Sequence, residues 1–323
     1  MTPGWAEETV YSRDPNRDRP GTAKAAPTLS IDVLVGIPTE DVVMATFPYI
    51  LKGIRDRAES EIKNRVDLDQ ITIDVYYRAP GKFDPRSKQE PVLKRQRPGD
   101  LNGAILVYPF AESAVEMISR NSGIVSVLES YDRLGIDVID TADASAFLML
   151  VERLHAAGHK RIGFLSWHYP IGGHWVARRF SGYVEALFVH GLDFRPEWVL
   201  NVRKNDPQLS APQLADAVAS RIRESGVTAW VCAADHQAYQ LMRDLQERAI
   251  RVPEDCSITG FDGLEPPPGL RRATSMRVPN EHIGASALSR VINRVIYPHS
   301  PLKKILVEAE LVAGETVAAP RSV

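Results

Sequence analysis

The sequence has little cysteine and no long apolar run, and both absences narrow the class of protein. Its 323 residues include two cysteines, Cys232 and Cys256, and each lies in a short apolar segment. We expect both to be small buried side chains in neighbouring strands, because their spacing fits neither a metal site nor a redox pair. No apolar run approaches the roughly 20 residues that a membrane-spanning helix needs. The N-terminus also lacks a basic segment followed by an apolar one, so we expect no signal peptide, no membrane partner and a cytoplasmic location.

Excess positive charge and catalytic motifs are lacking too. The formal net charge is -2, which argues against a broad nucleic-acid-binding surface, because such a surface needs excess Lys and Arg. The sequence contains no Gly-rich phosphate loop, no Gly-x-Ser-x-Gly elbow and no His-Glu-x-x-His pair. Nothing indicates a nucleophile with its base, a metal site or a cofactor site. The expectation is a protein that is not an enzyme and uses no cofactor.

A regular alternation of strands and helices is present instead. Hydrophobic residues make up 44% of the chain and charged residues 25%, which is typical of a soluble globular protein. From residue 29 onward, β-branched runs alternate with segments of helical periodicity. Strands are expected near 29–37, 71–77, 103–108, 124–128, 138–141, 161–165, 198–202, 229–233 and 257–261, with β-rich pieces at 304–313 and 315–318. Helices are expected at 111–121, 143–157, 175–190, 211–225, 237–248 and 280–296, after a first helix that carries Phe47, Ile50, Ile54, Ala58 and Ile62 on one face.

This alternation predicts the fold class. Strands that alternate with helices form parallel sheets covered on both faces. The number of strand–helix units exceeds what one sheet holds comfortably, so two similar lobes are expected. The sequence therefore predicts an α/β fold of two doubly wound parallel-sheet lobes.

Two segments do not follow the alternation. Residues 1–28 are polar, charged and Pro-rich, so we interpret them as a flexible tail or linker. Residues 79–100 contain four prolines and resist assignment, apart from a short helix expected near 87–96.

Four segments of the chain form a recognisable set. They are Leu154–Leu165 (LHAAGHKRIGFL), Arg179–Leu187 (RFSGYVEAL), Val252–Asp262 (VPEDCSITGFD) and Ile305–Thr316 (ILVEAELVAGET). Together they resemble the effector-binding region of the lactose/galactose-repressor (LacI/GalR) family. They occur in the family's order, and the resemblance extends over about residues 29–318.

The resemblance implies a periplasmic-binding-protein-like fold of type I, in which the chain crosses three times between its lobes. The N-lobe would comprise 29–158 plus 277–300, and the C-lobe 159–276 plus 301–318. It further implies a homodimer and a sugar-like or polyol effector held between the lobes, whose closure is transmitted allosterically to DNA binding.

DNA contact in this family depends on a helix-turn-helix headpiece of roughly 60 residues. The 28 residues before the first expected strand are Pro-rich and cannot form that module. The resemblance therefore implies operator DNA as a partner only through a headpiece missing from this chain; the other possibility is a protein that senses its ligand without touching DNA itself. The alternative is a solute-binding protein of a transport system, which shares the architecture; the missing signal peptide favours the regulator.

Polar residues just after strands are the candidates for ligand binding, because ligands of open α/β sheets lie outside the carboxyl ends of the strands. Asp262 follows the strand at 257–261 and matches the family aspartate that accepts hydrogen bonds from effector hydroxyls; a turn aspartate is the alternative. Arg179 matches the family arginine that points toward the ligand. The alternative for Arg179 is a solvated cation, although a cation near a helix N-terminus needs a compensating partner. Its neighbour Arg178 is expected at the surface.

For three further carboxylates, a ligand-binding role and a structural or surface role are about equally expected. Asp235 follows the strand at 229–233 and either binds the ligand or caps the helix at 237–248. Glu129 follows the strand at 124–128, and Asp132 can take its place. For both, a surface-loop position is an equal alternative.

The aromatic candidates are Phe47 and Trp167. Phe47 matches an aromatic position of the family site, and core packing is its rival explanation. Trp167 belongs to the aromatic loop 166–175, which suits the C–H face of a sugar ring. His168 and His174 in that loop lie outside any metal-ligand spacing and are interpreted as ordinary loop residues. Asp143 is expected to cap the helix at 143–157.

Overall fold

The chain folds into two compact units. The computed structural model describes residues 6–12, 27–37, 40–65, 67–87, 101–120, 123–169, 171–202 and 207–321. Unit 1 comprises Met1–Asp140 and Asn280–Val307, and unit 2 comprises Thr141–Pro279 and Glu308–Val323. The chain therefore passes from one unit to the other three times, as the predicted fold class requires.

Unit 1 is built on a mainly parallel seven-stranded sheet, in the order β1-β3-β2-β4-β5-β6-β12. Every pairing in the run from β3 through β6 is parallel, and β1 joins β3 antiparallel. The strands are β1 Ala6–Ser12, β2 Thr28–Gly36, β3 Gln70–Arg78, β4 Leu101–Val107, β5 Gly123–Val127, β6 Asp137–Thr141 and β12 Lys304–Val307. The helices are α1 Glu40–Asn64, α2 Glu112–Ser119 and α7 Asn280–Ile296.

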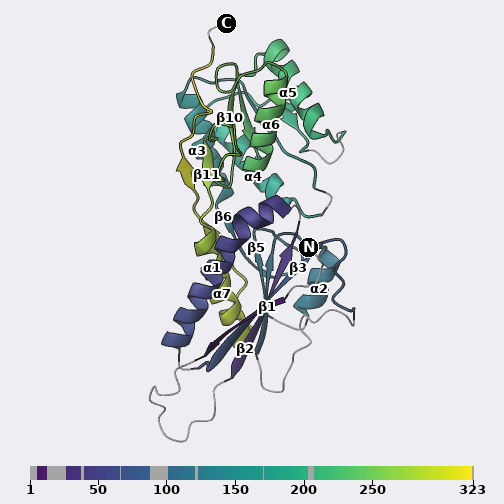
Figure 1. Cartoon of the computed structure of the whole chain (residues 1–323), viewed down its shortest axis with the longest axis vertical. Coiled ribbons are helices and arrows are strands. Elements are labelled where there is room, and N and C mark those ends of the chain that lie inside the picture. Colours follow the sequence, from purple (N-terminus) through teal and green to yellow (C-terminus); the bar gives the residue numbers. More distant parts are fainter. Residues whose placement is uncertain are drawn as a thin grey trace, which may run out of the picture. The chain divides into compact units, whose positions relative to one another are not determined.

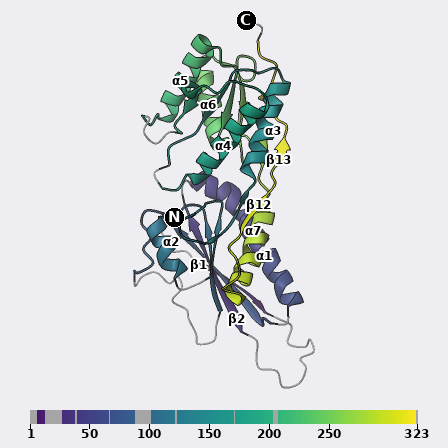
Figure 2. The same ribbon diagram turned by 180° about the vertical axis from the view of Figure 1, so that it is seen from behind.

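Helices cover both faces of this sheet (Figures 1 and 2). Helix α2 packs on a cluster that includes Leu106 and Ile124. Helix α7 packs on the other face, where a Cβ at Gly103 would overlap the side chain of Val291. Alternate residues of a strand point to opposite faces, so neighbouring strand positions serve the two helix layers. This is the doubly wound arrangement that the alternating sequence predicts.

The N-terminal segment corrects one sequence expectation. Residues 6–12 do not belong to a flexible tail: they form strand β1, whose register places Thr9 opposite Ile73. The many prolines and charges at 13–20 dominated the reading of the whole segment, although Thr9, Val10 and Tyr11 favour extended structure. The helix expected near 87–96 falls almost wholly outside the described residues.

Unit 2 has a four-stranded parallel sheet in the order β10-β9-β7-β8. The strands are β7 Ile162–Leu165, β8 Val199–Leu200, β9 Ala229–Cys232 and β10 Ser257–Thr259. A separate antiparallel pair consists of β11 Ser275–Arg277 and β13 Glu310–Val312. The helices are α3 Asp143–Ala156, α4 His174–Val189, the 3₁₀ turn η1 Pro196–Trp198, α5 Ala211–Ser225 and α6 Asp235–Glu247.

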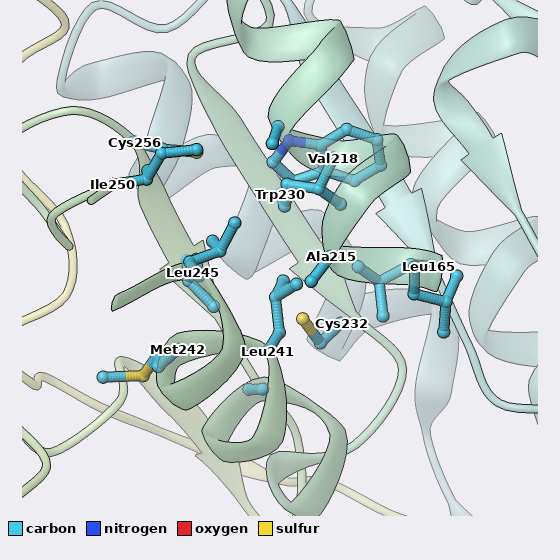
Figure 3. Close-up of a cluster of buried hydrophobic side chains, with 14 of the residues drawn as sticks. Leu165, Ala215, Val218, Trp230, Cys232, Leu241, Met242, Leu245, Ile250 and Cys256 are labelled. Carbon is cyan, nitrogen blue, oxygen red and sulfur yellow. The ribbon is translucent and has the colours of Figure 1, made fainter. Parts of the chain in front are cut away.

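The core of unit 2 has two layers, one on each face of the sheet. On one face, α5 and α6 enclose Trp230, which is fully buried beside both cysteines (Figure 3). On the other face, Phe147 of α3 stacks on Phe261 with ring centroids 5.4 Å apart. Both cysteines are free and buried, and burial raises the pKa of each thiol. They act as core side chains, as their apolar surroundings predict.

The division between the units differs from the expected lobe boundaries at three places. The smallest difference is at residues 277–279, which were expected in the N-lobe but belong to unit 2. Helix α3 was expected in the N-lobe, but Phe147 packs on Phe164 and Phe261, so α3 covers the sheet of unit 2. Residues 301–307 were expected in the C-lobe, but β12 extends the sheet of unit 1 beside β6. A helix that follows a strand in sequence need not cover the sheet containing that strand, and sequence pattern alone does not show which sheet it covers.

Some strands are also shorter than expected. The strand expected at 198–202 is reduced to the two residues of β8, and residues 315–318 form no strand. Within the residues that the structure describes, no helix is long and apolar enough to cross a membrane.

Several residues of the four family-like segments hold the fold of unit 2 together. His159 is 1% exposed, and its two ring nitrogens contact the hydroxyls of Thr228 and Ser257. The Tyr183 hydroxyl donates to the carbonyl of Ile162. His159 and Tyr183 thus connect a loop and a helix to the sheet of unit 2 by hydrogen bonds. These bonds give a structural role to the segments that contain the two residues.

Candidate functional site

A polar cluster lies at the carboxyl ends of the strands of unit 2, with Arg179 at its centre. Arg179 is 7% exposed and projects from α4. Its Nη1 donates to the carbonyl of Ala233 at 2.7 Å, and its Nη2 lies 3.4 Å from Oδ1 of Asp262. Its Nε lies 3.3 Å from Oδ1 of Asp143. The guanidinium therefore joins groups from α3, α4, the end of β9 and the segment after β10.

Two aromatic rings hold the same guanidinium. Its central carbon lies 3.8 Å from the ring centroid of Phe261 and 4.6 Å from that of Trp175. A planar guanidinium stacks well on aromatic faces, whereas a lysine ammonium does not. The solvated-cation reading of Arg179 is wrong, since the side chain is buried among compensating partners. Arg178, by contrast, keeps 30% of its side chain exposed while its Nε lies 3.4 Å from Oδ2 of Asp143.

Asp262 lies three residues after the end of β10, and its backbone is strained. Its φ is +119°, a region that residues with a Cβ rarely adopt. Hydrogen bonds from its amide to the carbonyl of Met276, and from the amide of Val278 to its carbonyl, hold that conformation. Such strain concentrates at ligand-binding positions. Burial raises the pKa of Asp262 to about 7, although the nearby Arg179 acts to lower it.

Asp235 does not cap α6, because the N-cap residue is Ala234 and no side chain supplies a capping bond. Its fully buried carboxylate accepts from the amide of Leu264 and the hydroxyl of Ser275, both at 2.7 Å. Burial raises the pKa of Asp235 to about 6. Asp235 thus holds the loop that follows Asp262.

Asp143 is the residue of this cluster that the sequence interpretation missed. It was expected to cap α3, but it is the first residue of that helix, after Ala142 at the N-cap. Its Oδ1 accepts from the hydroxyl of Thr141 at 2.9 Å, and it pairs with Arg179. A signal was available, because Asp143 also follows a strand, β6.

An aromatic group borders the cluster. Trp167 meets the ring of His236 edge-on, with centroids 4.9 Å apart. The Tyr169 hydroxyl is 2.9 Å from Nε2 of His236, and Nε2 of Gln237 donates to it at 2.9 Å. Burial, followed by the charge of Arg179, lowers the pKa of His236 to about 4. Of these residues, the sequence interpretation named Trp167 alone.

The three candidate ligand-binding residues of unit 1 lie in different environments. Glu129 is fully buried after β5, and its Oε1 accepts from the amide of Ser130 at 3.0 Å, so it does not lie in a surface loop. Asp132 does lie at the surface, where it pairs with Lys304. Phe47 is 2% exposed and packs edge-on against Tyr77, as the core-packing alternative predicts.

The two loop histidines have no part in the cluster's contacts. His168 and His174 are both exposed. Among the described residues, no group of three or more His, Cys, Asp or Glu side chains could hold a metal ion.

The chemistry of the unit 2 cluster follows from its composition. Two carboxyl groups, those of Asp143 and Asp262, contact the central guanidinium, and the Asp235 carboxyl is buried close enough to feel its charge. The cluster is therefore rich in hydrogen-bond acceptors. Such a set suits a ligand that donates several hydrogen bonds, and the adjoining aromatic rings suit its apolar face.

Comparison with known proteins identifies the family. Residues 151–317 match the family described as the periplasmic binding protein-like domain, and the chain belongs to that family. The prediction of a LacI/GalR-type effector-binding region is confirmed.

Individual relatives agree with this assignment. The chain is 25% identical over 221 residues to the HTH-type transcriptional repressor PurR of Vibrio vulnificus, a match that covers 66% of this chain and 63% of that protein. The chain thus spans less than two thirds of this relative's length. In fold, it is similar to a LacI family transcriptional regulator from Mycobacterium smegmatis, with a TM-score of 0.67, 22% identity and coverage of 90% of this chain and 100% of that one. It is also similar to a LacI family regulator from Enterococcus faecium with bound ribose, with a TM-score of 0.65, 19% identity and the same coverage. The predicted α/β fold class is confirmed.

Proposed function

We propose that this chain is the ligand-sensing core of a LacI/GalR-type bacterial transcriptional regulator. Its effector is a small molecule rich in hydroxyl groups, such as a sugar or polyol, and the protein senses this effector without converting it. A regulator of this class acts in the cytoplasm as a homodimer and reaches operator DNA through a separate headpiece. The observation that carries the proposal is the buried Arg179, which is shared between Asp262 and Asp143 at the strand ends of unit 2.

The composition of the cluster supports a hydroxyl-rich ligand. A carboxylate accepts from paired hydroxyls, and a planar guanidinium donates to their oxygens. The strained backbone of Asp262 places its carboxylate beside Arg179. The ribose bound to the Enterococcus faecium regulator belongs to this ligand class. We expect Arg179 and Asp262 to contact the effector directly, with Asp235 and Asp143 orienting them and Trp167 lying against the ligand's apolar face.

Both units are expected to take part in sensing. Glu129 is the unit 1 residue that we propose as a ligand contact, because it is buried directly after a parallel strand. A ligand shifts a conformational equilibrium only by its differential affinity for the two states. An effector that favours one arrangement of the two units would therefore change how a dimer presents its headpieces to DNA.

A thermal-shift screen tests ligand binding. D-ribose, D-glucose, a polyol such as sorbitol and a nucleoside such as adenosine are added to the purified chain. A ligand at 100 times its Kd stabilises the protein by about 2.7 kcal/mol, which raises Tm by roughly 4 °C for a protein of this size. The double variant Arg179→Met/Asp262→Asn should lose the shift, whereas Asp216→Asn, an exposed carboxylate of unit 2, should keep it. An unchanged shift in the double variant would contradict the site.

A second experiment separates regulation from transport. Deleting the gene in its source bacterium should change the transcript levels of a defined gene set when the effector is absent. A solute-binding protein would instead lower uptake of its solute without such a change. The relation to a transcriptional repressor favours the first outcome.

A further inference from the structure

Tyr169, His236 and Gln237 form a hydrogen-bonded chain beside Arg179 that the proposed function does not use. Nε2 of Gln237 donates to the Tyr169 hydroxyl oxygen at 2.9 Å. The hydroxyl oxygen lies 2.9 Å from Nε2 of His236. Gln237 is 1% exposed, and both it and His236 lie in the first turn of α6, next to Asp235.

Counting the available protons shows which atom donates and which accepts in each of these hydrogen bonds. The Gln237 amide donates to Tyr169, so the single hydroxyl proton of Tyr169 is available for His236. Nε2 of His236 must then accept, and a neutral imidazole that accepts at Nε2 carries its proton on Nδ1. Burial and the charge of Arg179 lower the pKa of His236 to about 4, which keeps the ring neutral near pH 7.

Two atoms at the ends of this chain are left without partners. Nδ1 of His236 and Oε1 of Gln237 are both buried, and neither makes a hydrogen bond to any group in the described parts of the chain. The first is a donor and the second an acceptor. A buried polar atom without a partner is unfavourable, and such atoms are rare unless a water or a ligand satisfies them.

We infer that Tyr169, His236 and Gln237 determine the specificity of the proposed effector site, by binding ligand groups that accept from His236 Nδ1 and donate to Gln237 Oε1. This inference rests on the proposed function and narrows its ligand class. A hydroxyl group meets both requirements, because it donates and accepts at once. An ionised carboxylate or phosphate accepts only, so it would leave Gln237 Oε1 unpaired. The site should therefore prefer a neutral sugar over the same sugar carrying a phosphate.

The donor and acceptor roles in the Tyr169–His236 hydrogen bond are testable without any ligand. The ¹⁵N shifts of the His236 ring distinguish a proton on Nδ1 from one on Nε2. In the wild-type chain we expect the Nδ1–H form at pH 7. In Tyr169→Phe, which removes the hydroxyl, we expect the Nε2–H form to gain population. Tyr183→Phe serves as the control, because its hydroxyl bonds elsewhere in unit 2. An Nε2–H ring in the wild-type chain, or one that Tyr169→Phe leaves unchanged, would overturn the assignment.

The reading of the ligand is tested by calorimetry with whichever of D-ribose and D-glucose binds, together with its monodeoxy and phosphorylated analogues. The wild-type chain should discriminate against one monodeoxy analogue and against the phosphorylated sugar by about tenfold or more, the effect of one lost hydrogen bond in a buried site. In Gln237→Met, the discrimination against that monodeoxy analogue should collapse. Gln240→Met is the matched control on the same helix, because Gln240 bonds Asp244 instead.

The outcomes separate the two hypotheses. If neither D-ribose nor D-glucose binds, the specificity assignment fails; if sorbitol does not bind either, the proposed function fails with it. If a sugar binds but Gln237→Met keeps the same preference among its analogues, the assignment alone fails. A collapse of discrimination confined to Gln237→Met supports both.

Discussion

Replacing Arg179 with methionine should destabilise unit 2 by more than any neighbouring charge substitution. Methionine preserves much of the stem but removes the guanidinium, whose side chain is 8% exposed. The change leaves the carboxylates of Asp262 and Asp143 and the carbonyl of Ala233 without their cationic donor. Breaking a buried pair by removing one partner costs about 3–5 kcal/mol. The 3.3 and 3.4 Å contacts to the carboxylates are long, so we expect about 3–4 kcal/mol.

Tryptophan fluorescence during urea unfolding measures this effect directly in unit 2. Four of the five tryptophans, Trp167, Trp175, Trp198 and Trp230, belong to that unit. The matched control is Arg178→Met, because that side chain keeps 30% of its surface exposed; it should cost about 1 kcal/mol or less. Equal losses for the Arg179 and Arg178 variants would refute the reasoning.

Three further predictions concern Asp262, Gly260 and Asp137. The folded chain keeps a proton on Asp262 up to about pH 7, whereas the unfolded chain releases it near pH 4. The contribution of Asp262 to the free energy of unfolding therefore falls as the pH rises between those values. Asp262→Asn should reduce the fall between pH 4.5 and pH 7.5 by about 3 kcal/mol, measured by urea unfolding, and an unchanged fall would contradict this prediction. In Gly260→Ala, the added Cβ would overlap the Asp235 carboxylate. The substitution should therefore destabilise unit 2 by about 2 kcal/mol or more, measured as a lower Tm. A Tm equal to that of the wild type would contradict this prediction, because it would show that the backbone around Gly260 relaxes freely. Asp137 is fully buried in unit 1, and its carboxylate accepts hydrogen bonds from Arg290 and Arg294 at 2.8 Å. Burial alone would raise the pKa of Asp137, but these hydrogen bonds outweigh it and hold the pKa below its usual value. Asp137→Asn should therefore lower the free energy of unfolding by about 3 kcal/mol, measured by calorimetry, and a loss below about 1 kcal/mol would contradict the buried ion pairing.

Sequence pattern predicted the elements of the fold because the signals are local. The first helix shows this well: Phe47, Ile50, Ile54, Ala58 and Ile62 were expected on one face, and all are at most 4% exposed. Strand β1 and the division at α3 were not predicted. Both depend on pairings between segments far apart in sequence, and pattern within a segment carries no information about its partner.

The candidate site was predicted in part for the same reason. Arg179, Asp235 and Asp262 were found because each stands beside a strand end or in a family-like motif, and the structure brings them together in unit 2. Asp143 was misread because an aspartate at a helix start fits a cap equally well. Gln237 carried no signal, since its role depends on a hydrogen bond to Tyr169, 68 residues away in sequence.

A crystal structure grown with the sugar that gives the largest thermal shift tests the central claim most directly. The account predicts density for the sugar in hydrogen-bond contact with the Asp262 carboxylate and the Arg179 guanidinium. Density bound elsewhere on the chain, with both side chains keeping only their present partners, would contradict it.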